Sequence, residues 1–370
     1  MKGDCVSKTM SKVYVGVIGC GRISGHHCRS ITGVKGVKLS SVCDLDEDKA
    51  KEYSKEYGVP WYKNYRKMLD EHPEINTVVI ATPSGMHFEH GLEIITKYKK
   101  NIIMEKPTFM RTDQLDEAYD KAEKHKVKIF PVFQNRYNKA VTRVSKALHD
   151  NELGDIRIIS VRVRWCRPQR YYDLAPWRGT FSHDGGALTN QGIHHVDLLR
   201  YLGGEVSKVN CTMRTLGADI EVEDTIVATL QYDTGAVGSL EVTTAARPDD
   251  FEASISIVGS KGLAQIGGVA VNELQIFTPD PECCAEYSED FSSGIGVYGN
   301  GHQKMYEDIV KVILYEERNP VSSKDCSSTI NLLNSFYLSD EKNNWVDVRD
   351  FKQSSRLGCD DEAISSLYRL

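Results

Sequence analysis

The stretch that decides the fold is residues 13–25, which read VYVGVIGCGRISG. Its first six residues form an apolar run without helical periodicity, which is typical of a strand buried on both faces of a parallel sheet. The next residues nearly match the pattern G-x-G-x-x-G, and a helical pattern follows from residue 24 to about residue 32. A strand, a glycine-rich loop and a helix in this order predict the start of a dinucleotide-binding domain.

The glycine-rich loop has the chemistry that a pyrophosphate requires, although such loops also occur as plain turns. The first glycine permits a tight turn, the second lets the backbone approach the phosphates, and the third position needs only a small residue, so Ser24 is acceptable there. The phosphates are expected at the helix N-terminus, where free N–H groups favour negative charge. The predicted cofactor contacts in this loop are Gly19, Cys20, Gly21, Arg22 and Ile23.

Asp44 supports the dinucleotide interpretation because it follows the second strand-like run, Val37–Cys43. An acidic residue at this place binds the ribose hydroxyls of NAD. Its carboxylate, with Asp46 and Glu47 beside it, repels a 2′-phosphate, so we expect NAD rather than NADP. The alternative is that Asp44 is only the N-cap of a helix predicted over residues 46–57.

Alternating strand and helix patterns continue to about residue 136. Strand-like runs at 75–81, 102–104 and 127–133 are separated by helical stretches at 87–98 and 112–126. Such alternation requires crossover connections and therefore predicts a parallel, doubly wound sheet. Since 370 residues exceed the usual size of one core, we expect two domains. They are an NAD-binding Rossmann domain over 1–136, with 1–10 as a flexible extension, and a substrate-binding and oligomerisation domain over 137–370.

Two polar segments follow neighbouring strands of the predicted sheet, namely Thr82-Pro83-Ser84 and Glu105-Lys106-Pro107. The carboxyl ends of such strands line the ligand crevice, so both segments are expected beside the nicotinamide half of the cofactor. A lysine placed there can donate to a substrate hydroxyl oxygen or share its proton while hydride leaves. Without this setting, Lys106 would be interpreted as a solvated surface group.

Residues 185–197 read GGALTNQGIHHVD and start a predicted helix over residues 187–202. In one continuous helix Asn190, His194 and Asp197 share a face, with Gln191 at its edge. An imidazole that is neutral near pH 7 is suited to take the proton of a hydroxyl group. The alternative for His194 is a hydrogen bond in a domain interface, whereas His195 points elsewhere and receives no catalytic role.

These motifs together resemble the Gfo/Idh/MocA oxidoreductases, and the resemblance covers nearly the whole chain. It rests on the glycine loop with His27, on Thr82-Pro83 with His87, on Glu105-Lys106-Pro107 and on residues 185–197. It implies an α/β fold with a Rossmann domain followed by an α/β domain that holds a large, mostly antiparallel sheet. It also implies Lys106 and His194 as catalytic residues, and a second subunit covering the sheet in a homodimer or homotetramer. The further cofactor contacts it implies are Thr82, Pro83, Ser84, His87, Glu105, Lys106 and Gln134.

Asn190 departs from the commonest family pattern, in which an aspartate lies four residues before the histidine. An amide cannot act as a proton acceptor, so we assign the acid–base work to His194 with Lys106 and expect Asn190 to orient the substrate. The Asn-Gln-x-x-His form, with QNRYN at residues 134–138, is similar to the branch that oxidises the 3-hydroxyl of UDP-N-acetylglucosaminuronic acid. Members of that branch make acetamido-sugars for bacterial surface polysaccharides, and some use 2-oxoglutarate to reoxidise bound NADH.

A substrate with a carboxylate and a pyrophosphate requires cations in the cleft, and arginine grips either group with two hydrogen bonds. The expected substrate contacts are Lys106, Asn135, Arg136, Tyr137, Arg167, Trp177, Arg178, Asn190, Gln191 and His194. Arg170, Tyr171 and Tyr172 are further candidates, and core packing is the alternative for the aromatic residues.

Composition excludes several other classes of protein. A formal net charge of -6 removes the general attraction to nucleic acid and to anionic membranes. No stretch offers ~20 uninterrupted apolar residues, and residues 1–12 hold no apolar signal region, so we expect a cytoplasmic protein. The ten cysteines lack metal-ligand spacing, so we expect no metal and interpret even Cys283-Cys284 as reduced thiols.

The rest of the second half predicts a sheet of hairpins and closing helices. Strand-like runs at 156–165, 225–232, 236–243, 253–258 and 263–266 are expected to pair as antiparallel hairpins, and helices are expected over 301–317 and 328–338. The tail over 352–370 has no predicted partner. Two other functions stay open: a relative that acts on a free sugar or polyol such as inositol, or reduces a keto or imino group, and a non-catalytic NAD sensor.

Overall fold

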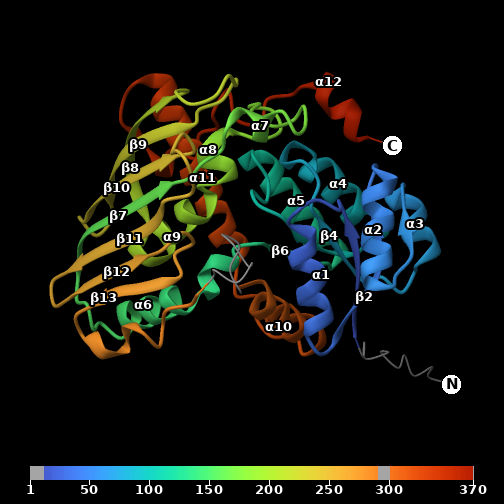
Figure 1. The fold of residues 1–370 in the computed structure, drawn as a ribbon, viewed down its shortest axis with the longest axis horizontal. Helices are drawn as coiled ribbons and strands as arrows, with labels where there is room; N and C mark the ends of the chain where they lie inside the picture. Colours follow the sequence, from blue (N-terminus) through green and yellow to red (C-terminus); the bar gives the residue numbers. More distant parts are fainter. Residues whose placement is uncertain (1–11, 291–300, 370) are drawn as a thin grey trace.

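The structure is a computed structural model that describes residues 12–290 and 301–369 (Figure 1). It contains a six-stranded sheet in the order β3-β2-β1-β4-β5-β6 and an eight-stranded sheet in the order β13-β12-β11-β7-β10-β9-β8-β14. The six-stranded sheet is parallel throughout, and most pairs in the larger sheet are antiparallel. The predicted fold class is therefore confirmed. The expected extension over residues 1–10 lies outside the described residues.

The first sheet has helices on both faces, as a doubly wound sheet requires. Its strands are β1 (Val13–Ile18), β2 (Val37–Cys43), β3 (Trp61–Tyr62), β4 (Thr77–Ile80), β5 (Asn101–Met104) and β6 (Ile129–Pro131). Its helices are α1 (Ser24–Gly33), α2 (Glu47–Tyr57), α3 (Tyr65–Glu71), α4 (His87–Glu93) with a π-helical turn η2 (Ile94–Tyr98), and α5 (Thr112–His125), with short 3₁₀ turns η1 (Ser84–Met86) and η3 (Gln134–Tyr137).

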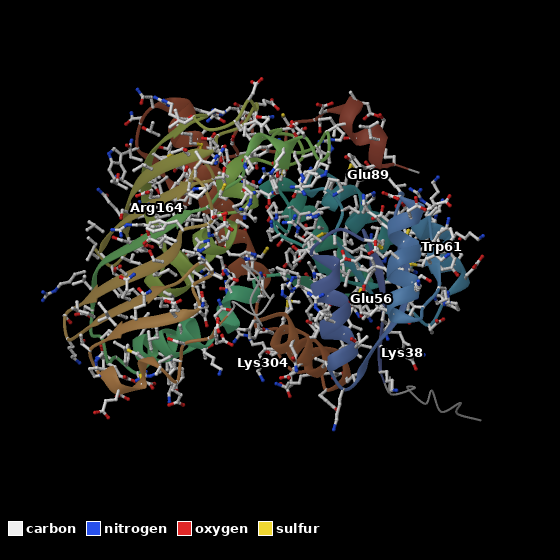
Figure 2. The ribbon with its side chains drawn as sticks, in the orientation of Figure 1. Lys38, Glu56, Trp61, Glu89, Arg164 and Lys304 are labelled. Atoms are coloured by element: carbon white, nitrogen blue, oxygen red, sulfur yellow. The ribbon has the colours of Figure 1, made fainter. Side chains whose placement is uncertain are left out.

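The second sheet corrects one expectation about strand pairing. Its strands are β7 (Ile156–Arg164), β8 (Val206–Arg214), β9 (Thr225–Tyr232), β10 (Val237–Thr243), β11 (Glu252–Gly259), β12 (Leu263–Gly267), β13 (Glu273–Phe277) and β14 (Val346–Asp347). The hairpins β9–β10 and β11–β12 are antiparallel as predicted. However, β7 and β10 run parallel, because the chain crosses the sheet between them. Arg164 of β7 links the strands on either side of it, because its guanidinium donates hydrogen bonds to Glu241 and Glu252 (Figure 2).

The predicted helix over residues 187–202 is two helices, α8 (Gly186–Asn190) and α9 (Ile193–Gly203). The break falls at Gln191 and Gly192, where the backbone passes close to β10. A Cβ atom on Gly192 would lie 2.9 Å from the carbonyl oxygen of Leu188 and 3.2 Å from Val242. Asn190 and His194 therefore lie on separate helices, and the single-face argument from helical spacing was wrong.

Helices of the second half cover the inner face of the larger sheet. They are α6 (Lys139–His149), α8, α9, and α11 (Ser323–Lys342), which packs against β8, α5 and α9. The short α7 (Gln169–Tyr172) lies on the segment between β7 and α8. Helix α10 (Gly301–Leu314) lies instead against α1 and η3 beside the first sheet (Figure 1). The second half of the chain thus contributes a helix to the nucleotide-binding half.

The tail after residue 352 has partners in both halves of the molecule, which corrects the expectation that it has none. Leu357 is fully buried, and Gly358 donates to the carbonyl oxygen of Phe181. The last turns, α12 (Glu362–Ser365) and η7 (Ser366–Tyr368), reach α4, where Arg369 forms an ion pair with Glu89 (Figure 2). The tail therefore spans the two domains.

No helix among the described residues combines the length and the apolar composition needed to cross a membrane. Cys283 and Cys284 lie in the 3₁₀ turn η4 (Pro281–Cys284), half-buried and without a disulfide bond. The short turn η6 (Val348–Asp350) follows β14.

Candidate active site

The glycine loop leaves the space that a dinucleotide phosphate needs. Gly19 has a φ of +92°, and a Cβ atom there would lie 2.4 Å from the carbonyl oxygen of Ala81, so the turn excludes every other residue. No described atom lies within 4 Å of the Cβ position of Gly21, which faces open space. Ser24, at the third glycine position, donates its hydroxyl to the carbonyl oxygen of Gly19 at 2.5 Å. The loop therefore fits NAD, with Arg22 and Ile23 at the start of α1.

Asp44 lies beside this loop at the end of β2. Its carboxylate oxygens accept hydrogen bonds from the backbone N–H of Cys20 at 2.6 Å and of Asp46 at 2.8 Å. The N-cap of α2 is Asp46, whose side chain accepts from Asp48 and Lys49, so the alternative role of Asp44 as N-cap is wrong. Asp44 is instead half-buried against the glycine loop, where it fixes the loop and leaves negative charge next to the expected ribose.

His87 connects the two strand-end segments that the sequence places at the nicotinamide. It is buried, with Nδ1 2.8 Å from the carbonyl oxygen of Pro107 and Nε2 3.0 Å from that of Thr82. Burial lowers the pKa of His87. We expected His87 to contact the cofactor, but the structure places it beneath the loops that carry Thr82, Pro83 and Ser84, where it holds their shape.

Lys106 reaches from the end of β5 to the second motif of the sequence. Its ammonium group donates to the carbonyl oxygen of Asn190 at 2.6 Å and to the side-chain oxygen of Asn190 at 2.9 Å. Burial lowers the pKa of Lys106, an effect that the nearby carboxylates Glu105 and Asp184 oppose. A lysine from the nucleotide half therefore meets the 185–197 motif from the other half.

His194 lies at the start of α9, within electrostatic range of Lys106. Its Nε2 lies 3.2 Å from Nε2 of Gln134, and its Nδ1 has no partner among the described residues. Burial first, and then the charge of Lys106, lower the pKa of His194 to about 3, so the ring is neutral at physiological pH. A neutral imidazole beside an ammonium group is able to accept a proton.

Asp184 belongs to this group and was missed by the sequence analysis. It is almost completely buried, accepts from the backbone N–H of Gly179 at 2.7 Å, and accepts from the side-chain amide of Asn190. Burial raises the pKa of Asp184. Its place directly before Gly185-Gly186 was the only available signal, because nothing in its spacing points toward Lys106.

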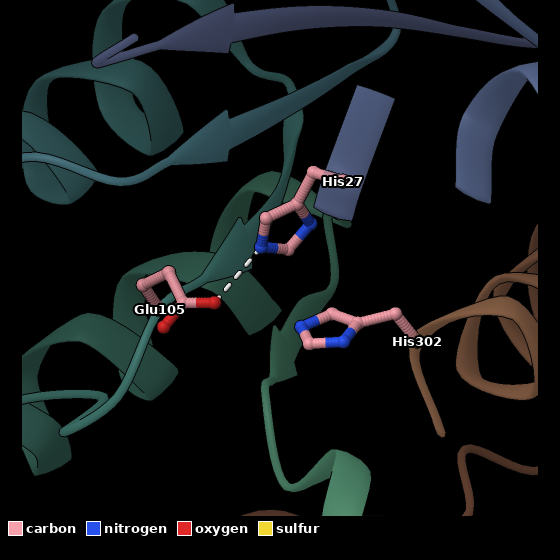
Figure 3. A group of neighbouring side chains, drawn as sticks. All are labelled: His27, Glu105 and His302. Atoms are coloured by element: carbon pink, nitrogen blue, oxygen red, sulfur yellow. Dashed lines mark hydrogen bonds and ion pairs between the residues drawn. The ribbon is translucent and has the colours of Figure 1, made fainter. Parts of the chain in front are cut away.

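Beneath Lys106 lies a buried cluster of His27, Glu105 and His302 (Figure 3), whose ligand-type atoms lie within 4.8 Å of one another. His27 contacts Glu105 at 2.8 Å through Nε2 and the hydroxyl of Tyr306 at 2.8 Å through Nδ1. Burial would raise the pKa of Glu105, but the hydrogen bond and charge of His27 outweigh it and bring it to about 2. The carboxylate expected to contact the cofactor is therefore turned into the protein, where Glu105, His27 and Tyr306 form a hydrogen-bonded network at the β5 end. The ring nitrogens of His302 have no hydrogen-bond partner among the described residues.

Arg136 was expected to bind substrate but lies in the interior. Its guanidinium donates to both oxygens of Asp197, from Nε at 2.7 Å and from Nη2 at 2.6 Å, and both side chains are buried. This pair joins η3 to α9, the two elements on which Gln134 and His194 meet. Asn135 is also buried, and Tyr137 packs against the apolar core beneath α10.

The other expected substrate residues lie on the segment between β7 and α8. The guanidinium of Arg178 lies over the rings of Tyr171 and Trp177, with distances of 4.3 and 4.6 Å to their centroids. Arg167 pairs with Asp250 at 2.8 Å, and the charges of Arg167 and Arg178 both act on Lys106. Gln191 donates to the hydroxyl of Tyr171 at 3.2 Å, whereas Tyr172 is buried against Thr244 and Arg170 is exposed.

Comparisons with known proteins identify the family of this chain. A family model described as "Oxidoreductase family, NAD-binding Rossmann fold" matches residues 13–133, and one described as "GFO/IDH/MocA C-terminal domain" matches residues 141–265. The WlbA dehydrogenase of Bordetella pertussis, solved with NADH and UDP-GlcNAcA, is 32% identical, with a TM-score of 0.85 over 92% of this chain and 98% of its own. The Chromobacterium violaceum WlbA dehydrogenase, solved with the same two molecules, is 33% identical, with a TM-score of 0.84 over 91% of this chain and 96% of its own.

A curated relative with another substrate is more distant. The myo-inositol 2-dehydrogenase of Thermotoga maritima is 24% identical over 67% of this chain and 73% of its own length. The family models cover both halves of the chain, and the glycine loop fits the cofactor that the first model names. The chain belongs to the Gfo/Idh/MocA family of NAD-dependent oxidoreductases.

Proposed function

We propose that this protein is an NAD-dependent dehydrogenase that oxidises the 3-hydroxyl of a UDP-N-acetyl-hexosaminuronic acid, in nucleotide-sugar biosynthesis for surface polysaccharide. The observation that carries the proposal is the likeness, over more than nine-tenths of the chain, to two dehydrogenases solved with NADH and UDP-GlcNAcA. The Asn-Gln-x-x-His form of the second motif adds to it.

The contacts of Lys106 and His194 support this chemistry. When bound, NAD accepts the hydride from the carbinol carbon. The ammonium group of Lys106 has two of its donors on Asn190, and its remaining donor is available for the substrate oxygen. The imidazole of His194 takes the hydroxyl proton as the carbonyl forms. Asn190 holds Lys106 in place. In this proposal Asn190 acts through Lys106, whereas we had expected it to orient the substrate directly.

The arginines near Lys106 offer contacts to an anionic substrate. Lys106, Arg167 and Arg178 form a group of three cations, and the carboxylates Glu105, Asp184 and Asp250 offset part of their charge. Arg178 lies on aromatic rings, which leaves its N–H edge to bind a carboxylate or a phosphate. We place Arg178, Arg167 and Trp177 at the nucleotide-sugar, with Gln191 and Tyr171 beside them.

A second candidate is oxidation of a free polyol, since a curated inositol dehydrogenase is among the relatives. The two candidates differ in whether the substrate carries a nucleotide. A polyol dehydrogenase has no use for the cation group, so UDP alone should not stabilise it. A thermal shift with UDP therefore separates the two.

The decisive experiment incubates the protein with UDP-N-acetylglucosaminuronic acid and NAD, with and without 2-oxoglutarate. We expect a product two hydrogens lighter by mass spectrometry and, if NADH stays bound between turnovers, full conversion only with 2-oxoglutarate. Parallel reactions with myo-inositol and without NAD are the controls. Oxidation of myo-inositol and not of the UDP-sugar would replace this proposal by the second candidate.

A further inference from the structure

Asp184 is a buried carboxylate at the candidate active site whose role the dehydrogenase reaction does not require directly. One oxygen accepts from the backbone N–H of Gly179 at 2.7 Å, and the other accepts from the side-chain amide of Asn190. It is 1% exposed, so water does not compensate its charge. A buried carboxylate of this kind needs a compensating cation, and Arg178 and then Lys106 are within electrostatic range.

The amide of Asn190 connects the two charges in a fixed direction. A carboxylate only accepts hydrogen bonds, so Asp184 must face the NH₂ end of the amide. The oxygen end must then face the other way, and there it accepts from the ammonium group of Lys106 at 2.9 Å. Lys106 only donates hydrogen bonds, so Asp184 and Lys106 favour the same orientation of the Asn190 amide and fix it from both ends.

Other charged groups around Lys106 do not provide the same compensation. The titratable and charged groups that face it are Glu105 from β5, Arg167 after β7, Arg178 and Asp184 from the segment before α8, and His194 from α9. Glu105 is engaged by His27 at 2.8 Å, and the two arginines are of like sign. Among these groups, Asp184 is the carboxylate joined to Lys106 through a single side chain.

We propose that Asp184 is a positioning residue that acts through Asn190 to hold the Lys106 ammonium group in place and to keep it protonated. The catalytic importance of this inference rests on the proposed function. The contacts from Asp184 through Asn190 to Lys106 are present without a substrate. A purely local role is the alternative, in which Asp184 only fixes the turn at Gly179.

The test measures the titration of Lys106 in the free protein. Competitive labelling of amines with acetic anhydride over a range of pH, with mass spectrometry of the peptide that contains Lys106, gives its labelling midpoint. In Asp184→Asn the midpoint should move to lower pH by about one unit, because a carboxylate that favours the charged lysine has gone. In Asp184→Asn/Asn190→Asp the charge lies directly beside the lysine, so the midpoint should return to the wild-type value or rise above it.

A matched control is Asp224→Asn. Asp224 is equally buried and accepts from the backbone N–H of Leu216 and Gly217, but it has no contact with Lys106. It should affect stability without moving the labelling midpoint. An unchanged midpoint in Asp184→Asn overturns the inference, and so does the same shift in the control.

The outcomes also separate this inference from the proposed function. If UDP-N-acetylglucosaminuronic acid is not oxidised, the labelling still decides the role of Asp184, since it needs no substrate. If the sugar is oxidised, the pH profile of kcat/KM should move with the labelling midpoint in both variants, and a profile that stays unchanged argues for the local role. Should Asp184→Asn fail to fold, the double variant decides alone, and a midpoint below wild type overturns the inference.

Discussion

Replacing Arg136 by methionine distinguishes a structural ion pair from a substrate contact. The guanidinium and the Asp197 carboxylate share two hydrogen bonds of 2.7 and 2.6 Å, and their side chains are 7% and 1% exposed. Removing the arginine leaves a buried carboxylate with Thr329 as its remaining described hydrogen-bond donor, at 3.0 Å. Breaking one partner of such a pair costs about 3–5 kcal/mol, so the free energy of unfolding should fall by that amount.

The measurement is the urea midpoint of Arg136→Met, of Asp197→Leu and of the double variant. The double variant should recover most of the loss, because no charge is left unpaired. Since the pair joins the elements that carry Gln134 and His194, kcat should fall while KM for the substrate stays near the wild-type value. An unchanged urea midpoint together with a raised KM would refute this reasoning and return Arg136 to the substrate site.

Four further predictions concern other parts of the molecule. His194→Asn should lower kcat by about two orders of magnitude or more while NADH still binds, and unchanged turnover would exclude His194 as the base. Asp44→Ala should weaken NAD binding and shift the kcat/KM ratio toward NADP, because the charge that repels a 2′-phosphate is gone; a ratio that still favours NAD to the same degree contradicts this. Burial raises the pKa of Glu223 from its usual 4.5 to about 8, so the stability that its proton confers is complete below pH 4.5 and is lost as pH rises to 8. The wild type should lose about 5 kcal/mol of unfolding free energy between those pH values, and Glu223→Gln should not, as measured by urea unfolding at each pH. A second copy of the chain should cover the outer face of the larger sheet, where Val227 and Val237 are 56% and 50% exposed. Light scattering should thus show a dimer or tetramer that Val227→Glu weakens, and a monomeric wild type would contradict this.

Local patterns in the sequence predicted many of the elements where a strand carried its own boundary signals, whereas β8, β13 and α6 were not predicted. The first strand ends just before Gly19 and the second just before Asp44, as the sequence analysis predicted. Pairing between distant strands carries no such signal. Segments β7 and β10 both alternate buried and exposed residues, and that pattern is the same for a parallel and an antiparallel neighbour.

Motifs identified the main groups of the candidate site but did not predict which charged side chains pair with one another. Lys106 was found because a strand end determines where its side chain lies. The role of Arg136 was misjudged because its partner, Asp197, lies far away in the sequence. Helical spacing assigned Asp197 instead to the helix face that carries His194. Asp184 was missed for a related reason, since it reaches Lys106 only through Asn190, whose place depends on the turn that ends α8.

The tail shows why such contacts escape prediction even when they bear on the site. It has no periodic apolar face, and it docks through single polar contacts, such as Ser365 with His183 at 3.2 Å and Gln353 with Thr112 at 2.9 Å. His183 directly precedes Asp184, and its carbonyl oxygen accepts from Gly85 in the loop after β4. Each exposed contact contributes little alone, but together they join the segment that carries Asp184 to the nucleotide-binding half. Because Lys106 comes from that half and Asn190 from the other, these contacts lie alongside the Lys106–Asn190 contact as links between the two halves.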